Sequence, residues 1–321
     1  MINSPQGETL QVSPTFAEKW WIYQRERFPV FAHGPLVLAF SSSAVCFSTQ
    51  LRGHFVLPPW YVFAFAFLSS FISFLHLRLA DEFKDFEEDS LYRPYRPVPR
   101  GLVTLRELAI LGFITAAIQL AMAVCLDTRL LWPLMITWTY LALMSKEFFC
   151  VKWLKAHPFT YMWTHMLIMP LIDFYATACD WLPTNSTAPQ GIFWFVAVSF
   201  FSGFIIEIGR KIRSPLDEET GVPTYSALWG RTSAVTGWLI VIVLTAVSAV
   251  IAAHWINFYI PMYGVLATFI VIAILLAVNF LRNPIPGSGK RFELFSGLWT
   301  LALYLTLGII PLVYYATRSA G

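Results

Sequence analysis

The sequence predicts an all-α membrane protein, a polytopic bundle of nine transmembrane helices, and three observations support this. Of its 321 residues, 57% are hydrophobic and only 13% are charged, which is more apolar than a soluble domain of this length. The mean hydropathy is +0.61. Nine apolar runs of spanning length follow residue 30. Separate spans in lipid must satisfy their backbone polar groups internally, so we expect each run to be a helix.

The predicted spans account for most of the chain. They lie near residues 31–51, 58–80, 104–126, 129–147, 158–180, 190–212, 232–254, 258–281 and 292–316. Residues 1–15 are polar and are expected to form a disordered tail. The segment 16–30 mixes aromatic with basic residues, as interfacial segments do. We expect residues 16–321 to form a single transmembrane domain.

The placement of charge orients the bundle. Nearly every Lys and Arg lies near the N-terminus or in the connections after the second, fourth, sixth and eighth spans. The opposite side holds only Arg52, Arg129 and Arg318. The positive-inside rule therefore predicts a cytoplasmic N-terminus and cytoplasmic connections on the charged side. We expect a multi-pass protein of a bacterial inner membrane.

The most informative stretch is 81–101, DEFKDFEEDSLYRPYRPVPRG, which follows the second span. Asp81, Asp85 and Asp89 recur four residues apart, so a helix would carry all three on one face. Like charges at this spacing oppose helix formation. A hard divalent cation such as Mg²⁺ is the usual partner of clustered carboxylates, and we expect one here.

Three arginines follow these aspartates on a proline-rich turn. Arg93, Arg96 and Arg100 are separated by prolines, which stiffen the backbone and end the helix. Guanidinium groups fork onto phosphate oxygens. Carboxylates that hold a metal, beside arginines of this kind, are the parts needed to grip a diphosphate. The alternative is a solvated, charged loop between two membrane helices.

A second charged cluster, 205–221, follows the sixth span and reads IIEIGRKIRSPLDEETG. Glu207 and Lys211 lie one turn apart in it. The two clusters follow the second and sixth spans, which are four spans apart. This offset suggests two four-helix units plus a ninth helix, as in bundles built from divergent repeats. We expect the two loops to cap a central cavity from the cytoplasmic side.

The run at 81–101 resembles the first signature of the UbiA superfamily of intramembrane prenyltransferases, which includes terpene cyclases. Asp81 stands where that family usually has Asn, whereas Asp85 and Asp89 match its metal-binding aspartates. Arg93 and Pro94 match its Arg-Pro pair. The nine-span layout and the four-helix offset are also similar. The resemblance implies a prenyl diphosphate substrate and one or two Mg²⁺ ions.

The second cluster departs from the family pattern, which repeats aspartates at four-residue steps. Glu207 can replace the first of these, but Lys211 stands where a second metal-binding carboxylate is expected. Either Asp217 or Glu218 supplies the missing ligand, or Arg210 and Lys211 contact the diphosphate and replace part of a second metal. We favour direct contact, because an ammonium group near Glu207 repels a cation.

These observations define a candidate site. The predicted catalytic residues are Asp81, Asp85, Asp89, Glu207 and Lys211. The predicted metal ligands are Asp85, Asp89, Glu207 and Asp217. The predicted substrate-binding residues are Arg93, Arg96, Arg100, Arg210, Arg213, His165, Asp173 and Tyr225.

Three members of this set come from outside the two motifs or just after them. His165 and Asp173, about two turns apart on the fifth span, share a face and either accept a proton or form an interhelical hydrogen bond. Tyr225 either touches phosphate or caps the seventh helix.

The function predicted is an enzyme that ionises a prenyl diphosphate and transfers the prenyl group to an aromatic or lipid acceptor. One alternative is a cyclase that captures the cation within its own chain. Another is a cation or metabolite transporter, although transporter sites usually lie near mid-membrane rather than at helix ends. The expected partners are the prenyl diphosphate and membrane lipids, with no nucleic acid, and the oligomeric state is left open.

Overall fold

The computed structural model describes residues 14–219, 222 and 224–319, and within these residues every regular element is helical. The predicted tail falls outside them except for Pro14 and Thr15. The longer helices are α1 (Phe16–Arg27), α2 (Val30–Leu51), α3 (Trp60–Lys84), α5 (Leu105–Leu126), α6 (Leu131–Ser145), α9 (Ile168–Trp181), α10 (Ile192–Arg210), α12 (Arg231–Trp255), α13 (Tyr259–Arg282), α14 (Lys290–Leu307) and α15 (Ile309–Ser319). The shorter ones are α4 (Phe86–Tyr92), α7 (Val151–Ala156), α8 (Pro158–Met166) and α11 (Tyr225–Trp229), with 3₁₀ turns η1 (Thr128–Leu130), η2 (Glu147–Phe149) and η3 (Pro215–Asp217).

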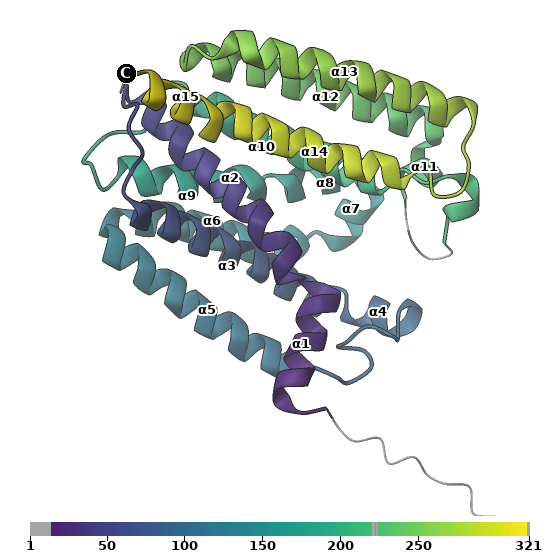
Figure 1. Cartoon of the computed structure of the whole chain (residues 1–321). Helices are drawn as coiled ribbons and strands as arrows, with labels where there is room; N and C mark the ends of the chain where they lie inside the picture. The colour runs from purple at the N-terminus through teal and green to yellow at the C-terminus, as the bar shows by residue number, and fades with distance from the viewer. Residues whose placement is uncertain (1–13, 220–221, 223, 320–321) are drawn as a thin grey trace, which may run out of the picture.

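The long helices form a bundle in which α10 packs against α12 and α14, and α2 packs against α3 and α9 (Figure 1). Large side chains fill the space between them, including the fully buried Trp238, Trp299 and Phe195. Helices α3, α5 and α6 form the other side of the bundle (Figure 1). The helices bury their small and aromatic faces against one another and turn other apolar side chains outward, as a lipid-embedded bundle requires.

Seven of the described helices are long and apolar enough to cross a membrane: α2, α3, α5, α10, α12, α13 and the pair α14–α15. The two other predicted spans, 129–147 and 158–180, correspond to the shorter α6 and to the interrupted pair α8–α9. The interruption at Leu167 lies three residues before Pro170, which has no N–H to donate to the carbonyl of Met166. The all-helical prediction is confirmed for the described residues, whereas nine spans remain a prediction.

The two charged clusters lie at the same end of the bundle. Helices α4, α7 and α11 gather there, and the C-terminal helix α15 lies at the opposite end (Figure 1). We call this region the α4 end. Helix α1 is tied to it because Lys19 Nζ pairs with Glu107 on α5 at 2.5 Å. Which side of the membrane it faces remains a prediction.

Helix α10 approaches α14 very closely next to the second cluster. Gly209, two residues after Glu207, permits this, because a Cβ there would overlap the Ser296 hydroxyl and come within 3.0 Å of the Phe292 carbonyl oxygen. The close approach fixes the position of the helix end that carries Glu207, Arg210 and Lys211.

We therefore expect Gly209→Ala to lower the free energy of unfolding by about 1–3 kcal/mol through overpacking. Gly237→Ala on α12 is the matched control, because a Cβ there meets nothing within 4 Å. It should be neutral or stabilising by up to about 1 kcal/mol. Thermal unfolding of both purified variants in detergent measures the difference, and equal stabilities would contradict the close-packing argument.

Candidate active site

The three aspartates of the first motif do not share one continuous helix. Helix α3 ends at Lys84, α4 begins at Phe86, and Asp85 lies between them with φ −95° and ψ 5°. The amides of Asp85 and Asp89 still donate to carbonyls four residues earlier, so the chain is kinked rather than unwound. The predicted common face is therefore divided, with Asp81 on α3 and Asp89 on α4.

Asp89 is buried in a network of guanidinium groups. Its carboxylate accepts a hydrogen bond from Arg93 at 3.0 Å and another from Arg96, and Arg27 of α1 lies 4.0 Å away. Arg27 also pairs with the buried Glu82 of α3. Burying a carboxylate is costly unless it is paired in this way. This network fastens α4 and its turn to α1 and α3, and the oxygen atoms of Asp89 are committed to it.

Asp81 and Asp85, by contrast, present open carboxylates. Their side chains are 42% and 41% exposed, and their cationic neighbours, Arg78 and Lys84, lie 3.7–4.0 Å away. Partial burial raises the pKa of Asp85, and the charges of Asp81, Asp89 and Glu88 add to this, while Lys84 opposes it. A cation bound beside Asp81 and Asp85 would relieve the repulsion between their negative charges.

The second cluster is neutralised by its own cations. Glu207 is buried, and its two oxygens pair separately with Arg210 at 2.5 Å and Lys211 at 2.8 Å. Lys211 also lies over the ring of Tyr225, 5.2 Å from its centroid. Burial and the charge of Glu207 raise the pKa of Tyr225, so its hydroxyl keeps its proton at neutral pH and can donate. The exposed parts of Arg210 and Lys211 are free to meet an anion.

Two residues of α8 connect the clusters. The ammonium of Lys84 donates to the Tyr161 hydroxyl at 3.0 Å, and His165 stacks on the Tyr161 ring at 3.9 Å between centroids. Helix α8, which carries both residues, also packs against α10. The ends of α3 and α10 therefore flank one shared region, which contains Tyr161 and His165.

The other predicted site residues form hydrogen bonds or ion pairs that hold parts of the fold together. Arg100 pairs with Glu26 of α1 at 3.0 Å. Asp217 accepts hydrogen bonds from the Ser214 hydroxyl and the Gly287 amide, both at 2.7 Å, and so joins two loops. These hydrogen bonds lower the pKa of Asp217. Asp173 accepts from the Tyr304 hydroxyl within the core. The backbone amide of Arg213 donates to Ser226, which positions the start of α11.

Lys84, Tyr161 and Glu147 belong to the region but were not among the predicted site residues. Lys84 stands inside the first motif as the last residue of α3, and its ammonium is directed toward Tyr161 of α8. Glu147 is the last residue of the fourth predicted span, where an acidic residue at a membrane boundary was the available signal. Its contact with Tyr161 joins α8 to the segment after α6, a pairing that periodicity does not reveal.

That segment has an unusual backbone. Glu147, Phe148 and Phe149 have φ values of 47°, 52° and 60°, so three consecutive side-chain-bearing residues are left-handed. Each such residue costs roughly 1–2 kcal/mol. The turn buries Glu147 and exposes Phe149.

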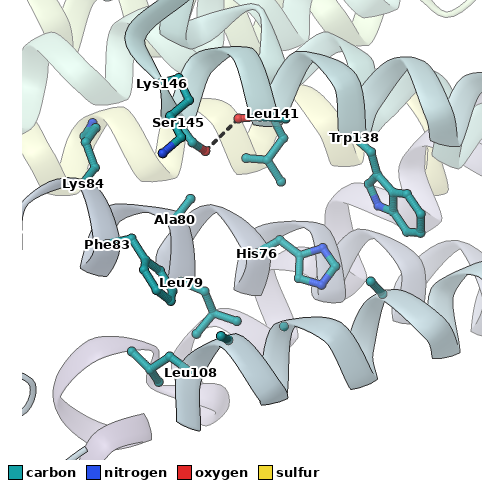
Figure 2. Close-up of a pocket in the computed structure, with 14 residues that line it drawn as sticks. His76, Leu79, Ala80, Phe83, Lys84, Leu108, Trp138, Leu141, Ser145 and Lys146 are labelled. Carbon is teal, nitrogen blue, oxygen red and sulfur yellow. Dashed lines mark hydrogen bonds between the residues drawn. The ribbon is translucent and has the colours of Figure 1, made fainter. Parts of the chain in front are cut away.

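An apolar cavity of about 460 Å³ adjoins the first motif between α3, α5 and α6. Lys84 and Lys146 lie on one side of it and Trp138 on the other, with His76 between (Figure 2). His76 contacts the Thr115 hydroxyl at 2.9 Å. The volume of the cavity falls in the range of about 300–1,000 Å³ typical of ligand pockets. The predicted central cavity was expected between the two clusters, and this one lies to the side of α3.

A family model described as the UbiA prenyltransferase family matches residues 38–299. The chain belongs to this family. Two solved structures share its fold. One, titled for digeranylgeranylglyceryl phosphate synthase in membranes, has a TM-score of 0.60 and 14% identity over 92% of this chain and 99% of that one. The other, an apo UbiA homologue from Aeropyrum pernix K1, has a TM-score of 0.65 and 14% identity, covering 88% of this chain and 98% of that one. No curated protein matches.

Family membership confirms the resemblance seen at residues 81–101 and makes the protein an integral, multi-pass membrane enzyme of the prenyltransferase type. Within the described residues, no group of three or more His, Cys, Asp or Glu is placed to hold a metal ion. Mg²⁺, however, usually keeps several waters and uses one or two carboxylates together with substrate phosphates. The open pair Asp81 and Asp85 would fit one Mg²⁺ ion bound in this way.

The left-handed turn of this UbiA protein gives a stability prediction. We expect Phe149→Gly to raise the free energy of unfolding by about 1 kcal/mol, because glycine adopts positive φ without strain and the Phe149 side chain is 80% exposed. Phe149→Ala removes the ring but keeps the Cβ, and it should give no gain. Thermal unfolding in detergent compares the two, and a gain with Ala equal to that with Gly would contradict the strain argument.

Proposed function

We propose that this UbiA protein is a Mg²⁺-dependent enzyme that ionises a prenyl diphosphate at the α4 end and transfers the prenyl group to an aromatic or lipid acceptor. The observation that carries the proposal is the shared region between α3 and α10. The open carboxylates Asp81 and Asp85 lie at the end of α3, where Lys84 bonds Tyr161 of α8, and α8 packs against α10, whose end carries Arg210 and Lys211. Carboxylates on one side and cations on the other suit a metal-bound diphosphate.

In this proposal, Asp81 and Asp85 would hold one Mg²⁺, and the bound ion would supply positive charge to offset that of the departing diphosphate. Arg210 and Lys211 bind its oxygens directly, because their partner Glu207 is already neutralised and is a poor cation ligand. Tyr225 donates from the same side. Asp89, with its arginines, holds the loop in position rather than holding the metal.

We place Arg93 and Arg96 in this supporting role because their side chains, paired with Asp89, are only 20% and 22% exposed, whereas those of Arg210 and Lys211 are 51% and 29% exposed. Arg100 acts with them through Glu26, and Asp217 holds the loop after α10 against Gly287. As direct ligands of phosphate or metal, these four residues remain predictions. The geometry favours the neighbouring groups with uncommitted atoms.

The prenyl chain lies in the apolar cavity between α3, α5 and α6. Its charged end meets Lys84 and Lys146, and its chain runs past His76 toward Trp138 (Figure 2). Apolar and aromatic walls keep water from an allylic cation and attract its charge. The cavity adjoins Asp81 and Asp85 through Lys84, so one substrate can reach both.

The proposal extends to orientation and membrane: the α4 end faces the cytoplasm of a bacterial inner membrane, as the excess of Lys and Arg favours. The alternative reaction is cyclisation. A terpene cyclase of the same family needs no acceptor, and the altered second cluster keeps this alternative open. Transport is less well supported, because the open carboxylates lie at helix ends beside cations suited to phosphate.

Incubation of the purified protein with Mg²⁺ and farnesyl or geranylgeranyl diphosphate tests the proposal. We expect Mg²⁺-dependent diphosphate release, lost on chelation of the metal. Asp85→Asn should reduce release at least 100-fold with unchanged thermal stability, because its side chain is open and weakly paired. A cyclic terpene formed without any acceptor would replace transfer by cyclisation, and no release under any condition would overturn both.

Asp89→Asn is the matched comparison within the same motif. Removing its charge leaves Arg93 and Arg96 without an ion-pair partner and Arg27 with Glu82 alone, and we expect a loss of about 3–5 kcal/mol in the free energy of unfolding. Thermal unfolding should therefore separate it from Asp85→Asn. If both variants kept wild-type stability and both lost Mg²⁺-dependent release, Asp89 would be a metal ligand after all.

The position of the chain is tested by filling the cavity. Ala116→Phe places a ring within it and should lower turnover of geranylgeranyl diphosphate at least tenfold relative to the shorter geranyl diphosphate. Ala117→Phe is the control, because Ala117 is the next residue of α5 and is exposed on the other face. If both variants kept the wild-type chain-length preference, the cavity would not hold the chain.

A further inference from the structure

Glu147 is a buried carboxylate that the proposed reaction does not yet use. It is only 4% exposed, and its Oε2 atom has no hydrogen-bond partner among the described residues. Its Oε1 atom accepts only a long hydrogen bond, 3.5 Å, from the Tyr161 hydroxyl. No ion pair to Glu147 is found in the described part of the chain. A buried carboxylate without a direct cation is costly and therefore calls for an explanation.

The backbone holds Glu147 in place at a cost in strain. It is the first of the three consecutive left-handed residues that form η2. Residues kept in such conformations are concentrated at functional sites. The strain and the unpaired oxygen are independent observations, and both concern the same side chain.

The hydrogen bonds of Tyr161 have a fixed direction. The Lys84 ammonium can only donate, so at 3.0 Å it donates to the Tyr161 oxygen. The Tyr161 hydroxyl proton is then left for Glu147, which accepts it on Oε1. Lys84 lies 3.8 Å from Asp81 and 4.0 Å from Asp85, so the Tyr161 hydroxyl connects the cation beside the open carboxylates to Glu147.

His165 is the competing acceptor. Its Nδ1 donates to the Tyr161 carbonyl oxygen at 2.8 Å, which leaves Nε2 with a lone pair that has no partner. It stacks on the Tyr161 ring, but no hydrogen bond joins it to the Tyr161 hydroxyl. Glu147 is therefore the base that this hydroxyl reaches.

We propose that Tyr161 and Glu147 carry away the proton that the reaction releases. This inference rests on the proposed function and adds two residues to it. Tyr161 meets the reacting groups, being beside Lys84 and the diphosphate end. Glu147 acts through Tyr161 as the final proton acceptor.

The atoms balance without any further reagent. The allylic C–O bond breaks, and the diphosphate leaves with the electron pair. A new bond forms between the acceptor and the allylic carbon, or within the chain in a cyclase. The proton lost from the acceptor, or from the cation itself, passes to the Tyr161 oxygen as the Tyr161 proton moves to Glu147. The carboxylate becomes a carboxylic acid, and it later loses this proton to water.

The test measures the ratio of coupled product to diphosphate released. Protein in lipid nanodiscs is incubated with Mg²⁺ and geranylgeranyl diphosphate, alone and with hydroquinone as a phenolic acceptor probe. Wild-type protein should give a ratio near one, as prenylated hydroquinone or as a cyclised terpene. Glu147→Gln and Tyr161→Phe should each lower the ratio at least tenfold, with prenyl alcohol in place of product, and the ratio reports coupling whatever the rate of diphosphate release.

Two controls separate chemistry from folding. Glu293→Gln alters an exposed carboxylate on α14 and should keep the wild-type ratio. Binding of a prenyl thiodiphosphate, which resists ionisation, should be unchanged in Glu147→Gln, because Glu147 does not contact the diphosphate in this proposal. A structural role for Glu147 would instead weaken binding and release together.

The possible results distinguish failure of this inference from failure of the proposed function. A wild-type ratio in both variants would overturn the inference, as would uncoupling by His165→Asn with none from Glu147→Gln. Wild-type release that yields only prenyl alcohol would also overturn it, because no coupled product then depends on proton removal. Absence of release from wild-type protein would instead overturn the proposed function itself.

Discussion

The burial of charge at the α4 end is the constraint on which the rest of the structure depends. Helices that cross lipid must end in a polar layer, and here that layer is packed tightly enough to bury Glu82, Asp89 and Glu207. Each of these carboxylates is held by one or more cations, since an unpaired charge in such a place is costly. Because these three carboxylates are paired, Asp81 and Asp85 are the two aspartates of the first motif that remain open to a ligand, and they define the candidate site.

The same constraint explains how far the sequence alone could be interpreted. The apolar runs and the four-residue spacing of the aspartates identified the helices and the first motif, because hydropathy and periodicity are local properties. The kink at Asp85 is not local. Arg27, which lies more than fifty residues earlier, pairs with Glu82 before the kink and lies 4.0 Å from Asp89 after it. Spacing along the chain therefore predicted one carboxylate face where the structure has two.

Residues outside the motifs were harder to predict for a related reason. Lys84 is one of several charges in its segment, and only the packing of α8 on the end of α3 singles it out. Glu147 depends on a left-handed turn, a conformation that the sequence EFF does not favour. Tyr161 connects them across two loops. Such contacts arise from tertiary packing, which periodicity cannot show.

The second cluster illustrates how one substitution changes the electrostatics of a half-site. A carboxylate at residue 211 would leave Glu207 with a like-charged neighbour one turn away and would favour a cation between them. Lys211 reverses this, because it pairs with Glu207 at 2.8 Å and adds a positive charge where a metal would otherwise supply it. A fixed ammonium delivers one charge, whereas Mg²⁺ delivers two. In the proposed function, the remaining neutralisation would come from an ion held by Asp81 and Asp85, which would make the two halves of the site unequal in kind.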